Sequence, residues 1–309
     1  MSLPDMPLGP TDLLLRPLGV GTNTWKDEAG ATPDSTNPAA AVESALASGV
    51  NLFDTAEIYN SGASERALGR ALAESEASAF VATKFAPLPW RLTSGSLHRA
   101  LDASLGRLQR ETVDLYQIHF PFTLLRIPSL MNRLAEAAEQ GRIRYAGVSN
   151  YSAAQMRTAH AALARRGVAL VSNQVNYSLL NRKPERNGLL EACRELDVTL
   201  IAYFPLASGM LTGKYRAGGR EARGFRRFSG SFRNPERVEP LLQALDEIGQ
   251  THGRSSAQVA INWLARQENI LPIPGARHAR QARENAGAID FAISDAEAAR
   301  LAELSDQLS

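Results

Sequence analysis

The sequence predicts an α/β fold, specifically a single (β/α)8 barrel, on three observations. Short apolar runs that suit buried parallel strands alternate with helical segments along most of the chain. About eight such runs can be counted, which is the number that closes a barrel. The 309 residues are 44% hydrophobic, and no linker or change of composition divides them. We therefore expect one domain over residues 1–309, with a doubly wound open sheet as the alternative fold.

Polar residues end or directly follow several of the expected strands, as at strand ends that face a site. They are 18–22, 51–54, 79–84, 113–118, 144–148, 170–174, 199–203 and 270–273.

Helix signals lie between these strands. Asn37 is a capping residue with Pro38 at the first helical position and Gly49 beyond the end. Ser152 and Gln155 form a capping box. The other helices are expected from 64, at 96–108, 130–139, 184–196, 236–249, 256–267 and 278–287, with an extra C-terminal helix from Asp295. A hairpin or lid is expected within 8–20, and a long basic loop over 208–235.

Composition excludes several classes of protein. The net charge is only +2, so nothing draws the chain to nucleic acid or to a membrane surface. Cys193 is the only cysteine, which rules out an internal disulfide and argues against a cysteine-ligated zinc site. The first residues lack the features of a signal peptide, and no apolar stretch is long enough for a membrane span. We expect a cytoplasmic protein.

Four polar side chains are predicted to share one rim of the barrel. Asp54, Lys84 and His119 each end a predicted strand, and Tyr59 lies in the loop after the second strand. Each has an ordinary structural explanation on its own, but packing does not explain all four together. A phenol with a pKa of about 10 is a weak acid unless a cation stabilises the phenolate. A lysine could do so, with the aspartate holding it and the histidine orienting a carbonyl.

Two other kinds of site are disfavoured. Gly19 and Gly21 begin a dinucleotide-binding pattern, but Thr24 stands where its third glycine belongs and no helix follows. A metal-dependent hydrolase is also disfavoured, because the histidines show no paired spacing and only His119 falls at a strand end.

The sequence resembles the aldo-keto reductase family over nearly its whole length. The matching stretches occur in the family's order and are 53–59 (FDTAEIY), 82–84 (ATK), 114–119 (DLYQIH), 147–150 (GVSN), 173–177 (NQVNY), 211–215 (LTGKY) and 273–276 (IPGA). Segments 89–95 and 258–263 look most like the pyridoxal-reductase, chloroplast-type branch. The resemblance implies reduction of an aldehyde or ketone with NADPH, with Tyr59 as general acid, Lys84 and Asp54 as its tuning pair, and His119 as substrate orienter.

The resemblance also implies a binding site for NADPH/NADP+ without a dinucleotide-binding fold. Ser149, Asn150 and Gln174 match the positions for the carboxamide, and Tyr203 matches the aromatic that stacks on the nicotinamide. Leu206, Ala207 and Lys214 match pyrophosphate positions, and Gly275, Arg277, Gln281, Glu284 and Asn285 match those for the adenosine 2′-phosphate and adenine. The remaining expected contacts are Gly21, Thr22, Asn23, Asp54, Phe204, Pro205, Ser208 and Gly209.

Two departures from the family pattern affect these expectations. Phe120 replaces the tryptophan that often follows the histidine, and Phe204 replaces the serine after the stacking aromatic, so a hydroxyl contact to phosphate is lost. The candidate walls of the substrate pocket are Trp25, Trp90, Phe120 and Phe122. Arginines 216, 220, 223, 226 and 227 of the basic loop are candidates to clamp the pyrophosphate.

A second functional class remains open. The family includes cofactor-bound regulatory modules such as potassium-channel β subunits, although the presence of His119 favours an enzyme. The natural carbonyl substrate stays open, as does the oligomeric state, with a slight preference for a monomer.

Overall fold

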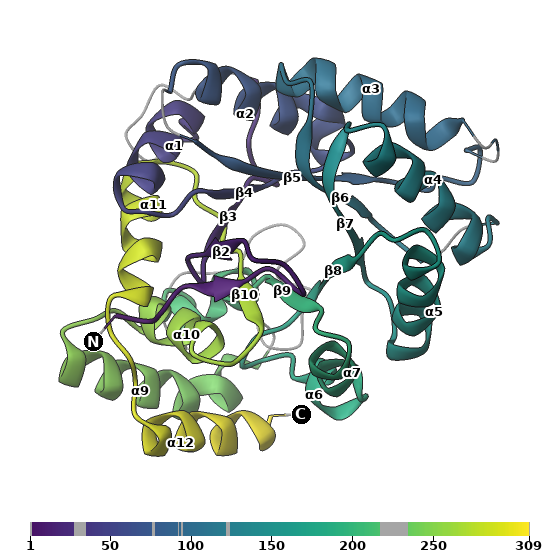
Figure 1. Ribbon diagram of the computed structural model, residues 1–309. Helices are drawn as coiled ribbons and strands as arrows, with labels where there is room; N and C mark the ends of the chain where they lie inside the picture. Colours follow the sequence, from purple (N-terminus) through teal and green to yellow (C-terminus); the bar gives the residue numbers. More distant parts are fainter. Residues whose placement is uncertain are drawn as a thin grey trace.

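Eight parallel strands form a nearly closed barrel, which confirms the predicted fold class (Figure 1). The computed structural model describes residues 2–27, 35–75, 78–91, 93, 95–121, 124–216 and 234–308. The strands follow chain order around the sheet, and a parallel bridge between Gly21 and Gly275 joins its two edges. They are β3 (Gly19–Gly21), β4 (Leu52–Asp54), β5 (Phe80–Phe85), β6 (Val113–Ile118), β7 (Ile143–Ser149), β8 (Leu170–Asn176), β9 (Thr199–Tyr203) and β10 (Ile270–Pro272).

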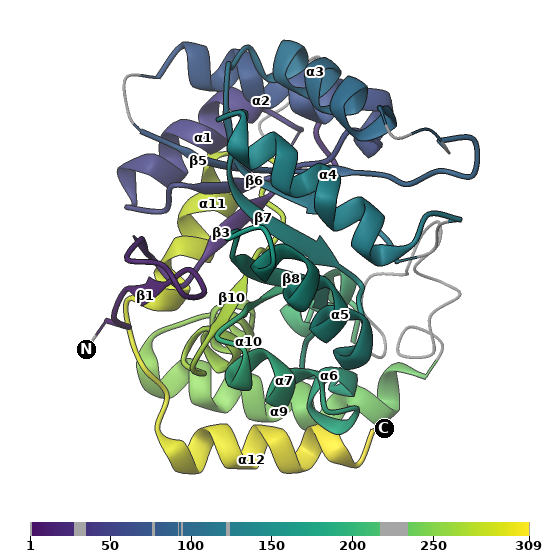
Figure 2. The same ribbon diagram turned by 45° about the vertical axis from the view of Figure 1, so that its right-hand side comes forward.

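Helices surround the barrel and bury its outer face (Figures 1 and 2). Asn37 accepts a hydrogen bond from the Ala40 amide at 3.1 Å, and the capping box at Ser152 is present, as predicted. The α-helices are α1 (Pro38–Ala47), α2 (Ala63–Ala73), α3 (Ser96–Leu108), α4 (Ile127–Glu139), α5 (Ala153–Ala164), α6 (Lys183–Arg186), α7 (Leu189–Glu195), α9 (Pro235–His252), α10 (Ser256–Ala265), α11 (Ala279–Ala286) and α12 (Asp295–Asp306). Short 3-10 helices are η1 (Tyr59–Gly62), η2 (Ala207–Thr212) and η4 (Gly287–Ile289).

Some helical boundaries and one loop differ from expectation. The segment predicted as one helix over 184–196 is divided into α6 and α7, because Gly188 adopts a left-handed conformation with φ of 74°. The helix α4 begins earlier than predicted because Pro128 suits its first turn. The loop expected over 208–235 contains η2, and its residues 217–233 lie outside the described part of the chain.

The N-terminal hairpin covers the end of the barrel where the strands begin. Its strand β1 (Met6–Pro7) lies just before the predicted range and β2 (Leu14–Leu15) lies within it, and Leu8 and Leu15 are buried against the barrel interior. Gly9, with φ of 54°, donates its amide to the Thr199 hydroxyl at 2.8 Å. A Cβ there would lie 2.7 Å from the Val171 carbonyl oxygen, so the close approach requires glycine.

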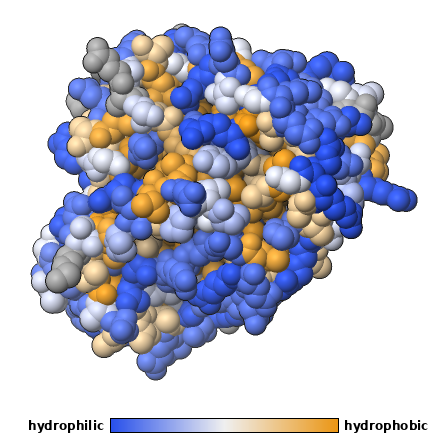
Figure 3. Space-filling model, in the orientation of Figure 1, coloured by the Kyte–Doolittle hydropathy of each residue, from blue (hydrophilic) through white to orange (hydrophobic). Residues whose placement is uncertain are grey.

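The molecular surface seen from the hairpin end is mostly hydrophilic at its edge and hydrophobic near its centre (Figure 3). Leu14 of the hairpin is 61% exposed. Across the described parts of the chain, no helix combines the length and apolar character needed to span a membrane.

Inside the barrel an apolar layer lies next to a polar one. Alternate residues of a strand point to the same side, so each apolar inward residue is followed two positions later by another inward residue. Leu52 is thus followed by Asp54, Ala82 by Lys84, and Leu115 by Gln117. The polar layer lies toward the strand ends that face away from the hairpin. These are the C-terminal ends of the strands, where the active sites of such barrels lie.

Candidate active site

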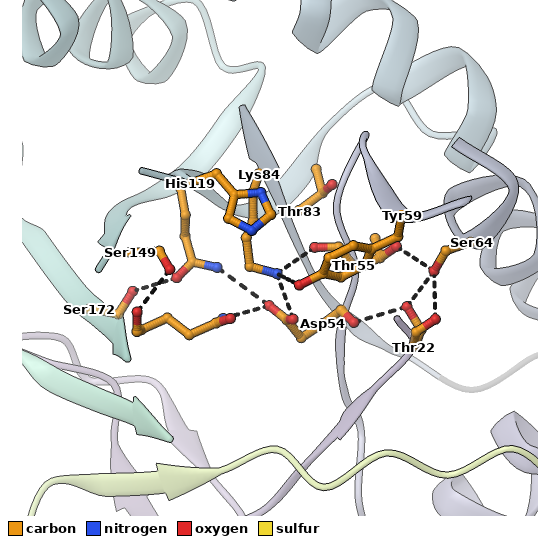
Figure 4. Close-up of polar contacts among 12 residues, drawn as sticks. Thr22, Asp54, Thr55, Tyr59, Ser64, Thr83, Lys84, His119, Ser149 and Ser172 are labelled. Atoms are coloured by element: carbon orange, nitrogen blue, oxygen red, sulfur yellow. Dashed lines mark hydrogen bonds and ion pairs between the residues drawn. The ribbon is translucent and has the colours of Figure 1, made fainter. Parts of the chain in front are cut away.

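The lysine, aspartate and tyrosine predicted to act together are in direct contact (Figure 4). Lys84 Nζ lies 2.6 Å from Asp54 Oδ2, 2.7 Å from the Thr55 carbonyl oxygen and 3.3 Å from the Tyr59 hydroxyl. Lys84 is completely buried and Asp54 is 2% exposed. A buried ammonium with this set of partners is fully paired, so the barrel tolerates it despite the cost of desolvation.

The ionisation of this group follows from burial and charge. Burial on its own would lower the pKa of Lys84, but Asp54 and Tyr59 together raise it, so the ammonium is kept. Burial raises the pKa of Tyr59 above 10, and the positive charge of Lys84 opposes the rise without reversing it. Lys84 thus acts on the phenol in the expected direction, whereas burial and the charge of Asp54 raise the pKa of Tyr59 by more. The phenol is therefore protonated at neutral pH.

His119 lies directly after β6, beside the phenol. Its ring centroid is 5.8 Å from that of Tyr59, edge to face, and it stacks on Phe120 at 4.2 Å. Burial, followed by the charge of Lys84, lowers the pKa of His119 from 6.5 to about 3. The imidazole is therefore neutral at physiological pH and can donate one hydrogen bond without carrying charge.

The loop that carries Tyr59 is fixed on both sides. Asn60, with φ of 48°, donates its amide to the Trp25 carbonyl oxygen at 2.7 Å. Glu57 accepts the Ala86 amide at 2.7 Å and forms a two-point ion pair with Arg91, whose second contact is 3.0 Å. These contacts hold the phenol against the end of β5, where the lysine lies.

A cleft of about 640 Å³ runs from these residues along the ends of the strands. This volume is typical of small-molecule sites. Most of the predicted site residues line it, namely Gly21, Thr22, Asn23, Asp54, Tyr59, His119, Phe120, Ser149, Asn150, Gln174, Tyr203, Phe204, Pro205, Leu206, Ser208, Gly209, Lys214, Gly275, Arg277 and Gln281. The sequence interpretation missed further lining residues: Thr24, Ile58, Thr212, Tyr215, Ile273 and Pro274. Each lies within one or two residues of a predicted site residue. This closeness in sequence could have identified them as lining residues.

Three residues expected to contact cofactor do not line this cleft. Ala207 lies within η2, where its φ is 47°. Asn285 donates its amide to the Gly275 carbonyl oxygen at 3.3 Å, and the Glu284 carboxylate accepts from Ser255 at 3.4 Å. In the structure the two polar side chains therefore support the neighbouring loops.

The structure corrects two of the predicted substrate-pocket walls. Trp25 is completely buried in the core and donates its indole N–H to the Ala276 carbonyl oxygen at 2.7 Å, so it cannot touch substrate. Trp90 is 74% exposed and does not line the cleft. Phe120 does line it, and Phe122 lies outside the described residues.

A cationic side chain and a helix end lie at the part of the cleft formed by the loop after β10. Arg277 and Gln281 line the cleft at the start of α11, and His278 caps that helix. A helix N-terminus carries partial positive charge, so an anionic group is favoured here. Arg216, expected as a possible pyrophosphate clamp, instead pairs with Glu239 and Asp246 of α9. The other four candidate arginines are outside the described residues.

The carboxamide-site candidates offer mainly acceptors to the cleft. Gln174 donates its amide to Asp54 at 2.7 Å, and the Ser149 hydroxyl donates to the Gln174 backbone carbonyl at 2.8 Å. Asn150 donates to the His119 carbonyl oxygen at 3.0 Å, and its own side-chain oxygen accepts from Tyr203 at 3.0 Å. Because the donors of Ser149 and Asn150 are already used, these side chains match a ligand that carries N–H donors.

The chain is similar in sequence and fold to two known reductases and a dehydrogenase. The chloroplastic pyridoxal reductase of Arabidopsis thaliana is 38% identical over 314 residues, covering 95% of this chain and 84% of that protein. A glycerol dehydrogenase from Gluconobacter oxydans superposes with a TM-score of 0.85 at 27% identity, covering 97% of this chain and 94% of the other. An aldo-keto reductase from Klebsiella pneumoniae, crystallised with NADPH, has a TM-score of 0.78 at 27% identity and coverages of 98% and 95%.

The sequence profile of the aldo/keto reductase family matches residues 17–306. With the barrel, the buried lysine beside a tyrosine, and the relatives above, the chain belongs to the aldo/keto reductase family.

Proposed function

We propose that this protein reduces an aldehyde or ketone to an alcohol with NADPH, using Tyr59 as the proton donor. The observation that carries the proposal is the 3.3 Å contact between Lys84 Nζ and the Tyr59 hydroxyl at the mouth of the cleft. Family membership supports carbonyl reduction, and NADPH is present in a related crystal structure.

NADPH fits the residues that line the cleft. The acceptors of Asn150 and Gln174 suit the N–H groups of a carboxamide, and Tyr203 offers an aromatic face nearby. Arg277 and the start of α11 suit a phosphate, and a 2′-phosphate would distinguish NADPH from NADH. When bound, NADPH supplies the hydride that reduces the carbonyl carbon.

The protein's own residues handle the proton. The raised pKa of Tyr59 keeps its proton in place until a carbonyl oxygen begins to accept charge. Lys84 stabilises the phenolate that remains, because the ammonium is held charged by Asp54. The neutral imidazole of His119 donates a hydrogen bond to the same carbonyl oxygen and orients it.

The substrate is proposed to be a small aldehyde, with pyridoxal the first to test. This choice rests on the similarity to a pyridoxal reductase. Ile58, which precedes Tyr59 in the sequence, and Phe120, which follows His119, both line the cleft. They provide apolar contact for a planar ring.

The decisive experiment is NADPH oxidation by purified protein with pyridoxal, methylglyoxal and aromatic aldehydes in parallel, repeated with Tyr59→Phe. Turnover should fall by roughly 10²–10⁴-fold in the variant, since general acid catalysis contributes this much. NADPH affinity should change little. Tyr145→Phe is the matched control, because Tyr145 packs on Phe80 at the hairpin end of the barrel. Full activity in Tyr59→Phe refutes the assignment.

The cytoplasmic location and monomeric state are also proposals. Cell fractionation tests the first, and light scattering of the purified protein tests the second.

A further inference from the structure

Two buried amides converge on the catalytic carboxylate. The side-chain nitrogens of Gln174 and Gln117 donate to Asp54 Oδ1, at 2.7 Å and 3.4 Å. Lys84 takes the other oxygen, Oδ2, at 2.6 Å. Gln117 is completely buried and Gln174 is 1% exposed. One oxygen of the Asp54 carboxylate thus accepts from two neutral amides, and the other accepts from the lysine ammonium.

The barrel makes room for these amides at a neighbouring strand. A Cβ on Gly147 would lie 2.9 Å from Gln117 Cγ and 2.5 Å from the Ser172 hydroxyl. Ser172 in turn lies 3.5 Å from the side-chain oxygen of Gln117 and can donate to it. Apolar side chains normally fill this part of such a barrel. Buried amides here are tolerated because they are hydrogen-bonded, and the bonds restrict where the carboxylate can sit.

Gln174 has a second contact surface, because it also lines the cleft. Its amide nitrogen is used by Asp54, and its Oε1 has no hydrogen bond from any residue that the structure describes. Its oxygen can therefore accept a hydrogen bond from a ligand. One side chain then touches both the cleft and the carboxylate that holds the lysine.

We propose that Gln117 and Gln174 are positioning residues that hold Asp54 so that Lys84 stays within reach of the Tyr59 hydroxyl. The contact of Gln174 with bound cofactor belongs to the proposed function. Neither amide touches the reacting atoms.

The effect of removing an amide follows from the geometry. A carboxylate that loses a donor becomes more basic and attracts the ammonium more strongly. The lysine then moves toward Asp54, and its 3.3 Å contact with the phenol lengthens. The phenol loses part of the charge that favours its ionised form, so it ionises at higher pH. The other titratable groups near the phenol are His119 and Tyr203, and both remain in every variant below.

The test measures the ionisation of the phenol in cofactor-free protein by ultraviolet difference absorbance of tyrosinate. Gln117→Met, Gln174→Met and Ser149→Ala are each compared with the same protein carrying Tyr59→Phe, so that subtraction isolates one phenol. Both glutamine variants should shift its ionisation upward by about half a pH unit, the equivalent of one modest hydrogen bond. Ser149→Ala, which does not touch Asp54, should leave it unchanged.

Measurements of cofactor binding distinguish the effects of the Gln174 and Gln117 substitutions. NADPH titration by protein fluorescence should show weaker binding for Gln174→Met and unchanged binding for Gln117→Met. The pH profile of alcohol oxidation with NADP+, which requires the phenolate, should shift upward in both. If a methionine variant does not fold, Gln117→Asn or Gln174→Asn withdraws the donor while keeping an amide.

Unshifted tyrosinate titrations in both glutamine variants would overturn the proposal, whatever their stability. The titration needs neither cofactor nor turnover, so its result is separate from that of the aldehyde assays. An inactive wild-type protein with shifted titrations would refute the reductase function and leave the positioning role intact.

Discussion

The neutral state of His119 predicts a loss of stability in mild acid that one substitution should remove. The pKa of His119 is about 3 in the folded protein, against 6.5 for a free imidazole. Below pH 6.5 the unfolded chain binds a proton at this position and the folded chain does not. Stability therefore falls as the pH decreases from 6.5 toward 3.

The magnitude can be calculated from these two values. Moving from about pH 7.5 to about pH 5 should cost the folded state ~2 kcal/mol through this one side chain. Because the folded pKa lies well below pH 5, the result depends almost entirely on the unfolded value. The side chain is only 6% exposed, so solvent screening does not reduce the effect much.

Urea unfolding at both pH values measures the difference. His119→Asn cannot titrate in this range, so it should lose about 2 kcal/mol less than wild type over the same change of pH. His160→Asn on α5 controls for loss of a histidine in general and should behave like wild type. Equal pH dependence in wild type and His119→Asn would show that the imidazole is not held neutral.

Three further substitutions test the packing around the site, each by urea unfolding. Lys84→Met leaves Asp54 buried without its cation and should destabilise the fold by about 3–5 kcal/mol while abolishing turnover; a stable, active variant contradicts the ion-pair argument. Gly147→Ala places a Cβ 2.5 Å from a serine hydroxyl and should cost about 1–3 kcal/mol, whereas Gly167→Ala, with open space around it but a φ of 69°, reports strain alone. Arg91→Leu leaves the Glu57 carboxylate, 6% exposed, without its ion pair and should cost on the order of 2 kcal/mol. An unchanged urea midpoint for Arg91→Leu would show that Arg91 does not stabilise the Tyr59 loop.

The sequence was sufficient to predict the barrel. It also predicted that Asp54, Tyr59, Lys84 and His119 lie at the same end of it. Strand periodicity places Asp54 and Lys84 on the same side as Leu52 and Ala82, so the inward direction of the polar residues could be predicted. The strand ends share one rim by topology, and this brings the histidine to the same place. Local pattern carries this information because each residue's direction depends on its immediate neighbours.

Local pattern did not reveal what each side chain would meet across the barrel. Trp25 was expected to contact substrate, yet it bonds to Ala276, which is 251 positions away. The Gln174 amide reaches Asp54 across 120 positions, and the sign of the Tyr59 pKa shift depends on how deeply the phenol is buried.

The sequence by itself thus determined which residues face the end of the barrel, since alternation along a strand is a local property. Only the tertiary structure decided which of them touch and how far water is excluded from them. The physical reason is that contact and burial depend on the packing of distant segments, and the free energy of a charge depends on both.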